Sequence, residues 1–161
     1  MSDATPADAT PAAATPAAAT PNVTPEPDGL PAWTHDFTSA LDEKMGFHLL
    51  ELSPERAVGR VPVEGNTQPY GLWHGGASCV MAETLGSMAA FAHARPEKIA
   101  VGVDINATHH RSVRSGHVTG VATAIKLGRT TAMYEIVLTD DHDNRICTAR
   151  LTCQLIPAPK H

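Results

Sequence analysis

The sequence has 161 residues, a formal net charge of −5 at pH 7 and 42% hydrophobic residues. Four of the acidic residues, Asp3, Asp8, Glu26 and Asp28, lie in the first thirty positions, so the rest of the chain is close to neutral. This balance gives no support for binding nucleic acid or a membrane surface through bulk charge, and the length suits one domain of ordinary size.

The N-terminal segment is dominated by an Ala-Thr-Pro sequence that recurs every five residues from position 4 to position 21. Such a segment has little to bury and cannot offset the entropy of ordering. We therefore predict a disordered Pro/Ala/Thr-rich tail over 1–32, one folded domain over 33–157 and a C-terminal tail over 158–161. No Lys or Arg precedes Lys44, which argues against a secretory signal or an Arg-rich transit peptide.

Three elements are expected before the middle of the chain. Residues 35–45 fit a short amphipathic helix with Phe37, Leu41 and Met45 on one side. Two strands should follow, over 47–52 and 56–63, separated by a Ser-Pro-Glu turn.

A twenty-residue stretch, Gly75–Ala94, is apolar or small at nearly every position. It predicts a long helix buried on all sides, and Glu83 is its only charged side chain. A carboxylate there is costly unless it is paired, hydrogen-bonded or used chemically. A satisfied core glutamate and a catalytic glutamate are both open on this observation alone. A glutamate at the centre also speaks against a membrane span.

Four strands are predicted after this helix, over 99–110, 117–127, 130–139 and 145–156, with turns at 128–129 and 140–144. The last strand alternates, with its inward residues predicted to be Cys147, Ala149, Leu151, Cys153 and Leu155. The pattern gives an α+β fold in which a mostly antiparallel sheet wraps around one long buried helix.

The cysteines do not form a disulfide framework. Cys147 and Cys153 are six residues apart on one strand, hence about 20 Å apart, too far to bridge. Reduced thiols favour a cytoplasmic location. Cys79 as a nucleophile has no local base, and His109-His110 belongs to no metal-binding motif of the expected spacing.

The start of the long helix carries a Gly75-Gly76 pair. Free N–H groups and the positive end of the helix dipole suit an oxyanion or a polarised carbonyl there. The alternative is that the glycines only allow close backbone packing, which this pattern favours less. Gly75 and Glu83 are eight residues apart, about 12 Å along a helix, so they can act on one small group only from different subunits. This spacing suggests a homodimer with active sites at its interface.

Three further polar residues fall near this helix. Ser87 lies one turn after Glu83 and on its face, Gln68 lies in the entry loop, and His74 directly precedes Gly75. Each taken alone is more often an ordinary polar residue of a loop or helix.

A basic strip follows, because the sequence has no acidic residue between Asp104 and Glu135. The interval contains Arg111, Arg114, Lys126 and Arg129, which suit the phosphate groups of a small ligand or the protected edge of a sheet.

Three motifs together resemble the hotdog-fold acyl-CoA thioesterases. They are Gln68-Pro-Tyr-Gly-Leu-Trp-His74-Gly-Gly-Ala-Ser, Ala82-Glu83-Thr-Leu-Gly-Ser87 and Asn106-Ala-Thr-His109-His-Arg111. The resemblance covers about residues 40–156. It is closest to the group that acts on 4-hydroxybenzoyl-CoA, on 1,4-dihydroxy-2-naphthoyl-CoA or on aryl groups of the enterobactin carrier protein.

The resemblance implies a division of roles around the thioester. Glu83 would be nucleophile or general base, and the Gly75 N–H would polarise the carbonyl, with Gln68 and His74 beside it. Ser87, from the subunit of Glu83, would position the water or the carboxylate.

The resemblance also implies the residues that bind the substrate. His109 and Met88 would line the acyl pocket, while Arg111, and less directly Arg129, would meet the phosphates of coenzyme A.

The implied enzyme is a cytoplasmic homotetramer of paired dimers that needs no cofactor, since coenzyme A is part of the substrate. Menaquinone biosynthesis, carrier-protein proofreading and aromatic catabolism all remain open as settings. The alternatives within this fold are a hydratase or dehydratase, in which His74 and Glu83 would pair, and a protein that only binds acyl-CoA.

Overall fold

The computed structural model describes residues 29–36 and 39–159. Most of the predicted N-terminal tail, Phe37 and the last two residues lie outside this part of the chain. The described elements, in chain order, are a 3-10 helix η2 (Ala32–Asp36), α1 (Ala40–Met45), β1 (His48–Leu52), β2 (Arg56–Pro62), α2 (Gly75–Ala94), β3 (Lys98–His109), β4 (His117–Leu127), β5 (Thr131–Thr139) and β6 (Arg145–Pro157).

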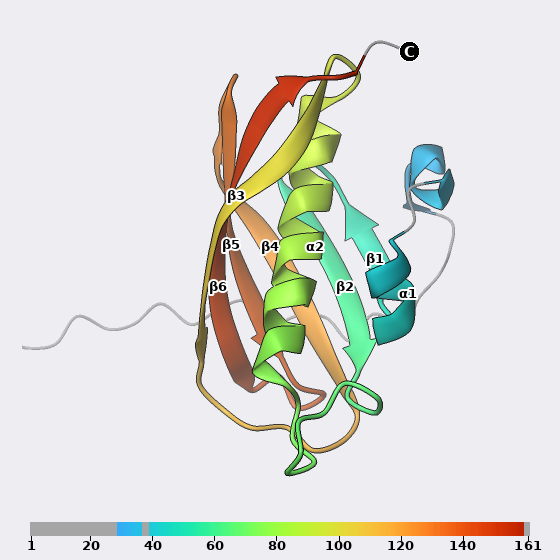
Figure 1. Cartoon of the computed structure of the whole chain (residues 1–161), viewed down its shortest axis with the longest axis vertical. Coiled ribbons are helices and arrows are strands. Elements are labelled where there is room, and N and C mark those ends of the chain that lie inside the picture. Colours follow the sequence, from blue (N-terminus) through green and yellow to red (C-terminus); the bar gives the residue numbers. More distant parts are fainter. Residues whose placement is uncertain (1–28, 37–38, 160–161) are drawn as a thin grey trace, which may run out of the picture.

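The six strands form one antiparallel sheet in the order β1-β2-β4-β5-β6-β3. The sheet curves around α2, which crosses its concave face (Figure 1). The predicted α+β arrangement of a sheet wrapped around one helix is therefore confirmed, and α2 begins and ends at the predicted residues.

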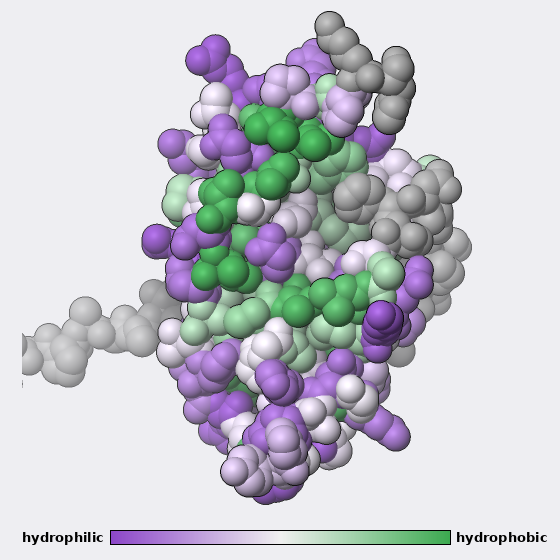
Figure 2. All heavy atoms as spheres, viewed as in Figure 1, coloured by the Kyte–Doolittle hydropathy of each residue, from purple (hydrophilic) through white to green (hydrophobic). Residues whose placement is uncertain are grey.

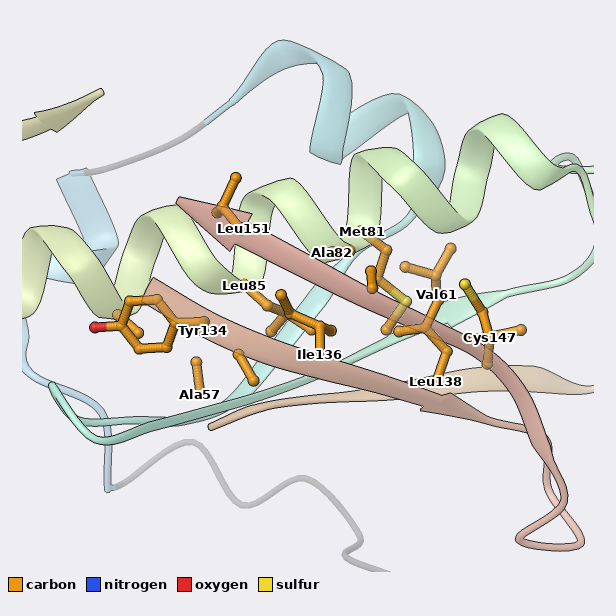
Figure 3. Packing of buried hydrophobic residues seen from close by; sticks show 14 of the residues in the cluster. Ala57, Val61, Met81, Ala82, Leu85, Tyr134, Ile136, Leu138, Cys147 and Leu151 are labelled. Carbon is orange, nitrogen blue, oxygen red and sulfur yellow. The ribbon is translucent and has the colours of Figure 1, made fainter. Parts of the chain in front are cut away.

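The core lies between α2 and the inner face of the sheet (Figure 3). Met81 and Leu85 of α2 meet Ile136 and Leu138 of β5, and these side chains are at most 1% exposed. The predicted alternation of β6 is also confirmed, because its five inward residues are all buried. Burial of such aliphatic side chains contributes about 1.5–3 kcal/mol each, so this layer supplies much of the stability.

One side of α2 departs from the expectation of burial on all sides. Gly75, Cys79, Glu83 and Ser87 are each partly exposed, and they follow one another at steps of four residues. Residues spaced by four lie on the same side of a helix, so they form a stripe beside β3 and β6 that the chain's own sheet covers only in part. We call these four residues the α2 stripe. Helical periodicity could not reveal this side, because the whole segment is apolar or small.

The strand next to this stripe, β3, is an edge of the sheet. Val101 and Val103 on β3 are 43% and 61% exposed. In the view of Figure 2, apolar residues gather over the side of the molecule that carries α2 and β3. An exposed apolar edge strand is a ready surface for pairing with another chain.

The N-terminal elements differ from the predicted single helix over 35–45. Helix α1 begins only at Ala40, because the Ser39 hydroxyl accepts a hydrogen bond from the Asp42 N–H at 3.3 Å and caps it. Met45 is buried as predicted, whereas Leu41 is 53% exposed. Upstream, Trp33 of η2 meets the Phe91 ring edge-on, with ring centroids 5.2 Å apart.

No helix in the described part of the chain combines the length and the apolar character that crossing a membrane requires.

Candidate active site

The start of α2 is shaped by the side chain that precedes it. His74 is the N-cap, with an extended backbone, and its Nδ1 accepts a hydrogen bond from the Gly76 N–H at 2.8 Å. The Gly75 N–H, in the first position of the helix, has no intrahelical acceptor. The cap thus leaves Gly75 as the donor that can serve a ligand, and an accepting Nδ1 requires His74 to be neutral with its proton on Nε2.

The loop before α2 is fastened to the body of the protein. The His74 N–H donates to the Asn66 carbonyl at 3.0 Å, and the Trp73 N–H donates to the Val113 carbonyl at 2.8 Å. The buried Trp73 Nε1–H also donates to the Ser78 hydroxyl at 2.7 Å. These bonds fix the direction in which the helix start points.

Gln68 lies in the same loop but folds back on it. The side-chain Oε1 of Gln68 accepts a hydrogen bond from the Tyr70 N–H at 2.9 Å, and the backbone N–H of Gln68 donates to the Leu72 carbonyl. The carboxamide oxygen is therefore engaged, which leaves the Nε2 group as the donor that can face a thioester carbonyl.

His109, the last residue of β3, lies against the start of α2. A methyl carbon built on Gly75 would lie 2.9 Å from His109 Nε2, so the ring covers the position where a larger residue would project. The structure thus brings His109, Gly75 and His74 together at one end of the α2 stripe.

The carboxylate of Glu83 lies two turns further along the stripe. Its Oε1 accepts a hydrogen bond from the Ser87 hydroxyl at 3.1 Å. The same oxygen rests on the backbone of Gly102 in β3, in the space that a side chain at 102 would fill. The arrangement holds one carboxylate oxygen between the Ser87 hydroxyl of α2 and the backbone of the edge strand β3.

Comparison with known proteins places the chain in a family. The sequence profile of the Thioesterase superfamily matches residues 70–147. The proofreading thioesterase EntH of Cronobacter turicensis is 43% identical over 113 residues, which are 70% of this chain and 82% of that protein. The chain belongs to the thioesterase superfamily.

Solved structures agree with this placement. Thioesterase HI1161 of Haemophilus influenzae superposes with a TM-score of 0.74 at 34% identity, over 79% of this chain and 90% of that one. A mutant of thioesterase PA1618 of Pseudomonas aeruginosa gives a TM-score of 0.72 at 38% identity, over 78% and 91%. The predicted hotdog fold and the predicted class, a thioester hydrolase, are confirmed. The roles predicted for individual residues stay predictions.

The thioesterase does not bring all its predicted binding residues together within one chain. Arg111 is exposed two residues after His109, near the start of α2. Arg129 lies by the other end of the helix, since the adjacent Gly128 carbonyl is 3.0 Å from His93 Nε2. A helix of 20 residues spans about 30 Å, so the two arginines cannot meet one phosphate in a single chain.

Met88 was predicted to line the acyl pocket, and in the single chain it is 8% exposed. It directly follows Ser87 on α2 and so lies beside the α2 stripe rather than on it. A role in shaping the acyl pocket stays a prediction.

Two residues of the site were missed by the sequence analysis. Gly102 interrupts a strand pattern, and an isolated glycine in a strand often marks a close backbone approach, so a signal was present. Cys153, which lies 4.0 Å from the Ser87 hydroxyl, gave no signal beyond its inward position on β6.

The described residues contain no cluster of three or more His, Cys, Asp or Glu side chains arranged to hold a metal ion.

Proposed function

We propose that this thioesterase hydrolyses an aryl acyl-CoA thioester to the free acid and coenzyme A, with each active site shared between two subunits. The observation that carries the proposal is the α2 stripe. It contains the N–H of Gly75 at the helix start and the carboxylate of Glu83, which accepts a hydrogen bond from Ser87, on the same partly exposed side of one helix.

The spacing within the stripe supports a second copy as the missing half of the site. Gly75 and Glu83 are about 12 Å apart along the helix axis. Two α2 helices packed antiparallel about a two-fold axis would bring Gly75 of each subunit beside Glu83 of the other. The same packing would cover the exposed Val101 and Val103 of the neighbouring edge strand.

The chemistry follows from these two groups. The Gly75 N–H and the positive end of the helix dipole would polarise the thioester carbonyl, with the Gln68 amide and His74 beside it. Glu83 of the other subunit would then act as general base on water or as nucleophile, with Ser87 holding one of its oxygens. In the general-base route water adds to the carbonyl, the carbon–sulfur bond breaks as the carbonyl re-forms, and the thiol of coenzyme A leaves with the proton taken from water. In the nucleophile route Glu83 would displace the thiolate and form a mixed anhydride, which water would then hydrolyse to release the acid and the free carboxylate. No metal or redox cofactor is required for this reaction.

An aryl acyl group suits the surroundings of the helix start. His109 lies against Gly75, and Tyr70 in the adjoining loop is 81% exposed, so both can meet a ring near the polarised carbonyl. Arg111 would meet a phosphate of coenzyme A, and Arg129 would have to come from another subunit. We therefore propose a 1,4-dihydroxy-2-naphthoyl or hydroxybenzoyl thioester as substrate, in a cytoplasmic homotetramer of paired dimers.

A second candidate is supported by the relatives. Two matching proteins, from Cronobacter turicensis and Cronobacter sakazakii, carry the name proofreading thioesterase EntH. An aryl group on a carrier protein is joined to it by the same kind of bond, a thioester. The same site would then release aryl groups from a carrier protein.

Release of free thiol from a panel of thioesters tests the reaction and ranks the substrates. The panel contains 1,4-dihydroxy-2-naphthoyl-CoA, hydroxybenzoyl-CoA, phenylacetyl-CoA, a medium-chain acyl-CoA and an aryl group on a carrier protein. We expect fast turnover of an aryl thioester that falls at least about 10²-fold in Glu83→Gln, which keeps the shape of the side chain. Turnover that survives this change would refute the assignment of Glu83, and no turnover on any of the five would refute the proposed substrates.

Hybrid dimers test whether the site is shared. Gly75→Pro removes the N–H at the first helical position, where proline is tolerated, and the extended backbone of His74 suits a following proline. Gly75→Ala is the matched control, since it adds a side chain near His109 but keeps the N–H. A refolded equal mixture of Gly75→Pro and Glu83→Gln should regain about one quarter of wild-type activity, because half the dimers are hybrids with one intact site. No recovery, with hybrids present, would show that both groups act within one chain.

A further inference from the structure

A buried thiol lies behind the carboxylate on the side of the helix that faces the sheet. Cys153 of β6 is 0% exposed, and its Sγ lies 4.0 Å from Ser87 Oγ, within reach of a hydrogen bond to sulfur. Ser87 Oγ in turn lies 3.1 Å from Glu83 Oε1. Cys153 is also the cross-strand partner of Gly102, the residue against which Glu83 Oε1 rests. The four residues therefore form one contiguous group across α2, β3 and β6.

The hydrogens of this group can be assigned from its chemistry. An ionised carboxylate has no hydrogen to give, so the Ser87 hydroxyl must donate to Glu83. Its single hydrogen is then used, and the contact with Cys153 can be made only if the thiol donates to the Ser87 oxygen. Burial raises the pKa of the Cys153 thiol to about 11, with the Ser87 contact lowering it and the Glu83 charge raising it further, so the thiol keeps its hydrogen at neutral pH.

We propose that Cys153 is a positioning residue, which donates its thiol hydrogen to Ser87 and so holds the Ser87 hydroxyl toward Glu83. A helical serine otherwise has a competing acceptor, the backbone carbonyl one turn earlier, which here is that of Glu83 itself. With the thiol in place, Glu83 Oε1 stays occupied, and Oε2 is the oxygen presented to water or to the thioester. The inference rests on the proposed function of Glu83.

Two buried cysteines on the same strand provide a matched pair of variants. Cys153→Ala removes the donor, whereas Cys147→Ala removes an equally buried thiol on β6 that has no contact with Ser87 or Glu83. We expect Cys153→Ala to lower kcat about tenfold at unchanged KM, the effect of one lost hydrogen bond in the transition state. Cys147→Ala should keep kcat within about threefold of wild type, and Cys153→Ser, which keeps a donor, should recover most of the loss. A wild-type kcat in Cys153→Ala, or an equal fall in Cys147→Ala, would overturn the proposal.

Infrared spectroscopy tests the bond without any substrate. In a Cys79→Ala/Cys147→Ala background, Cys153 is the only thiol, and its S–H stretching band reports whether it donates. Adding Ser87→Ala should move the band to the higher frequency of a free thiol. A band that does not move would overturn the inference whatever the enzyme hydrolyses. A protein that shows this shift but hydrolyses no thioester would instead count against the proposed function alone.

Discussion

Glu83 and Gly102 are in direct contact, with the carboxylate oxygen Oε1 in the space beside the Gly102 backbone that a side chain would take. A methyl carbon at 102 would overlap Oε1 and would lie 3.1 Å from Glu83 Cδ. The orientation of the Glu83 carboxylate thus depends on the absence of a side chain at position 102 of β3 as well as on the hydroxyl of Ser87. This contact links the edge strand, whose outer side is exposed, to the group proposed to carry out the hydrolysis.

Gly102→Ala should therefore displace the carboxylate while leaving the fold intact. We expect kcat to fall about 10²-fold, because a shift of about 1 Å in a catalytic group has this effect. Thioesterase kinetics measure the loss, and Ile125→Ala is the control, expected to keep kcat, because this 55% exposed residue lies on β4, which β5 and β6 separate from β3. Sedimentation should show the same oligomeric state for both variants. Full activity in Gly102→Ala would mean that the position of Oε1 is not important for the reaction.

The elements predicted best were those whose signal is local. The composition of 75–94 fixed both ends of α2, and β4 also matched its predicted residues. The alternation of β6 predicted which of its residues face the core. In each case the local sequence pattern and the packing of the folded protein favour the same element, so tertiary contacts do not override the predicted secondary structure.

The features that were missed depend on contacts between distant segments. The helix predicted over 35–45 was too long, although Ser39 followed three residues later by Asp42 is a capping pattern that marks its start. The contact of Glu83 with Gly102 depends on the register of β3 against β6, which shifts between Gly102 and Asp104. Periodicity within one segment contains no information on such a register.

Ser78→Ala should destabilise the entry to α2. The hydroxyl of Ser78, which is 1% exposed, accepts the hydrogen of buried Trp73 Nε1 at 2.7 Å. Its removal leaves an unsatisfied buried donor, which costs about 1–3 kcal/mol. Urea unfolding measures this change in the free energy of unfolding. Ser53→Ala, in a partly exposed turn, is expected to cost less, and equal losses would contradict the argument from burial.

Trp33 should stabilise the domain, whereas the residues before it should not. Its ring lies under the Arg95 guanidinium, 4.4 Å from the ring centroid, and against Phe91. We expect Trp33→Ala to lower the free energy of unfolding by about 1–2 kcal/mol. Deletion of residues 1–31 keeps Trp33, so activity, oligomeric state and stability should stay unchanged. A loss of stability from the deletion as large as that from Trp33→Ala would contradict this division.

The β5–β6 hairpin should lose stability in acid because of Asp140. Burial alone would raise the pKa of this carboxyl, but hydrogen bonds from the Asn144 side chain and from the N–H groups of Asn144 and His142 hold it below its usual value. A carboxyl whose folded pKa is depressed binds its proton more readily in the unfolded chain, where the value is about 3.9. Its contribution is therefore fully present above about pH 4 and is lost as the pH falls through the lower, folded value.

Urea unfolding of wild type and Asp140→Asn at about pH 6 and about pH 3 measures this contribution. We expect the two proteins to differ most at pH 6 and to converge at pH 3, because the wild-type carboxyl is then becoming protonated. Asp143→Asn is the control, since this exposed carboxyl lies in the same turn but does not accept the hydrogen bonds that Asp140 accepts, and it should follow the wild type at both pH values. A difference between wild type and Asp140→Asn that stays constant with pH would show that the hydrogen bonds at Asp140 do not depend on its charge.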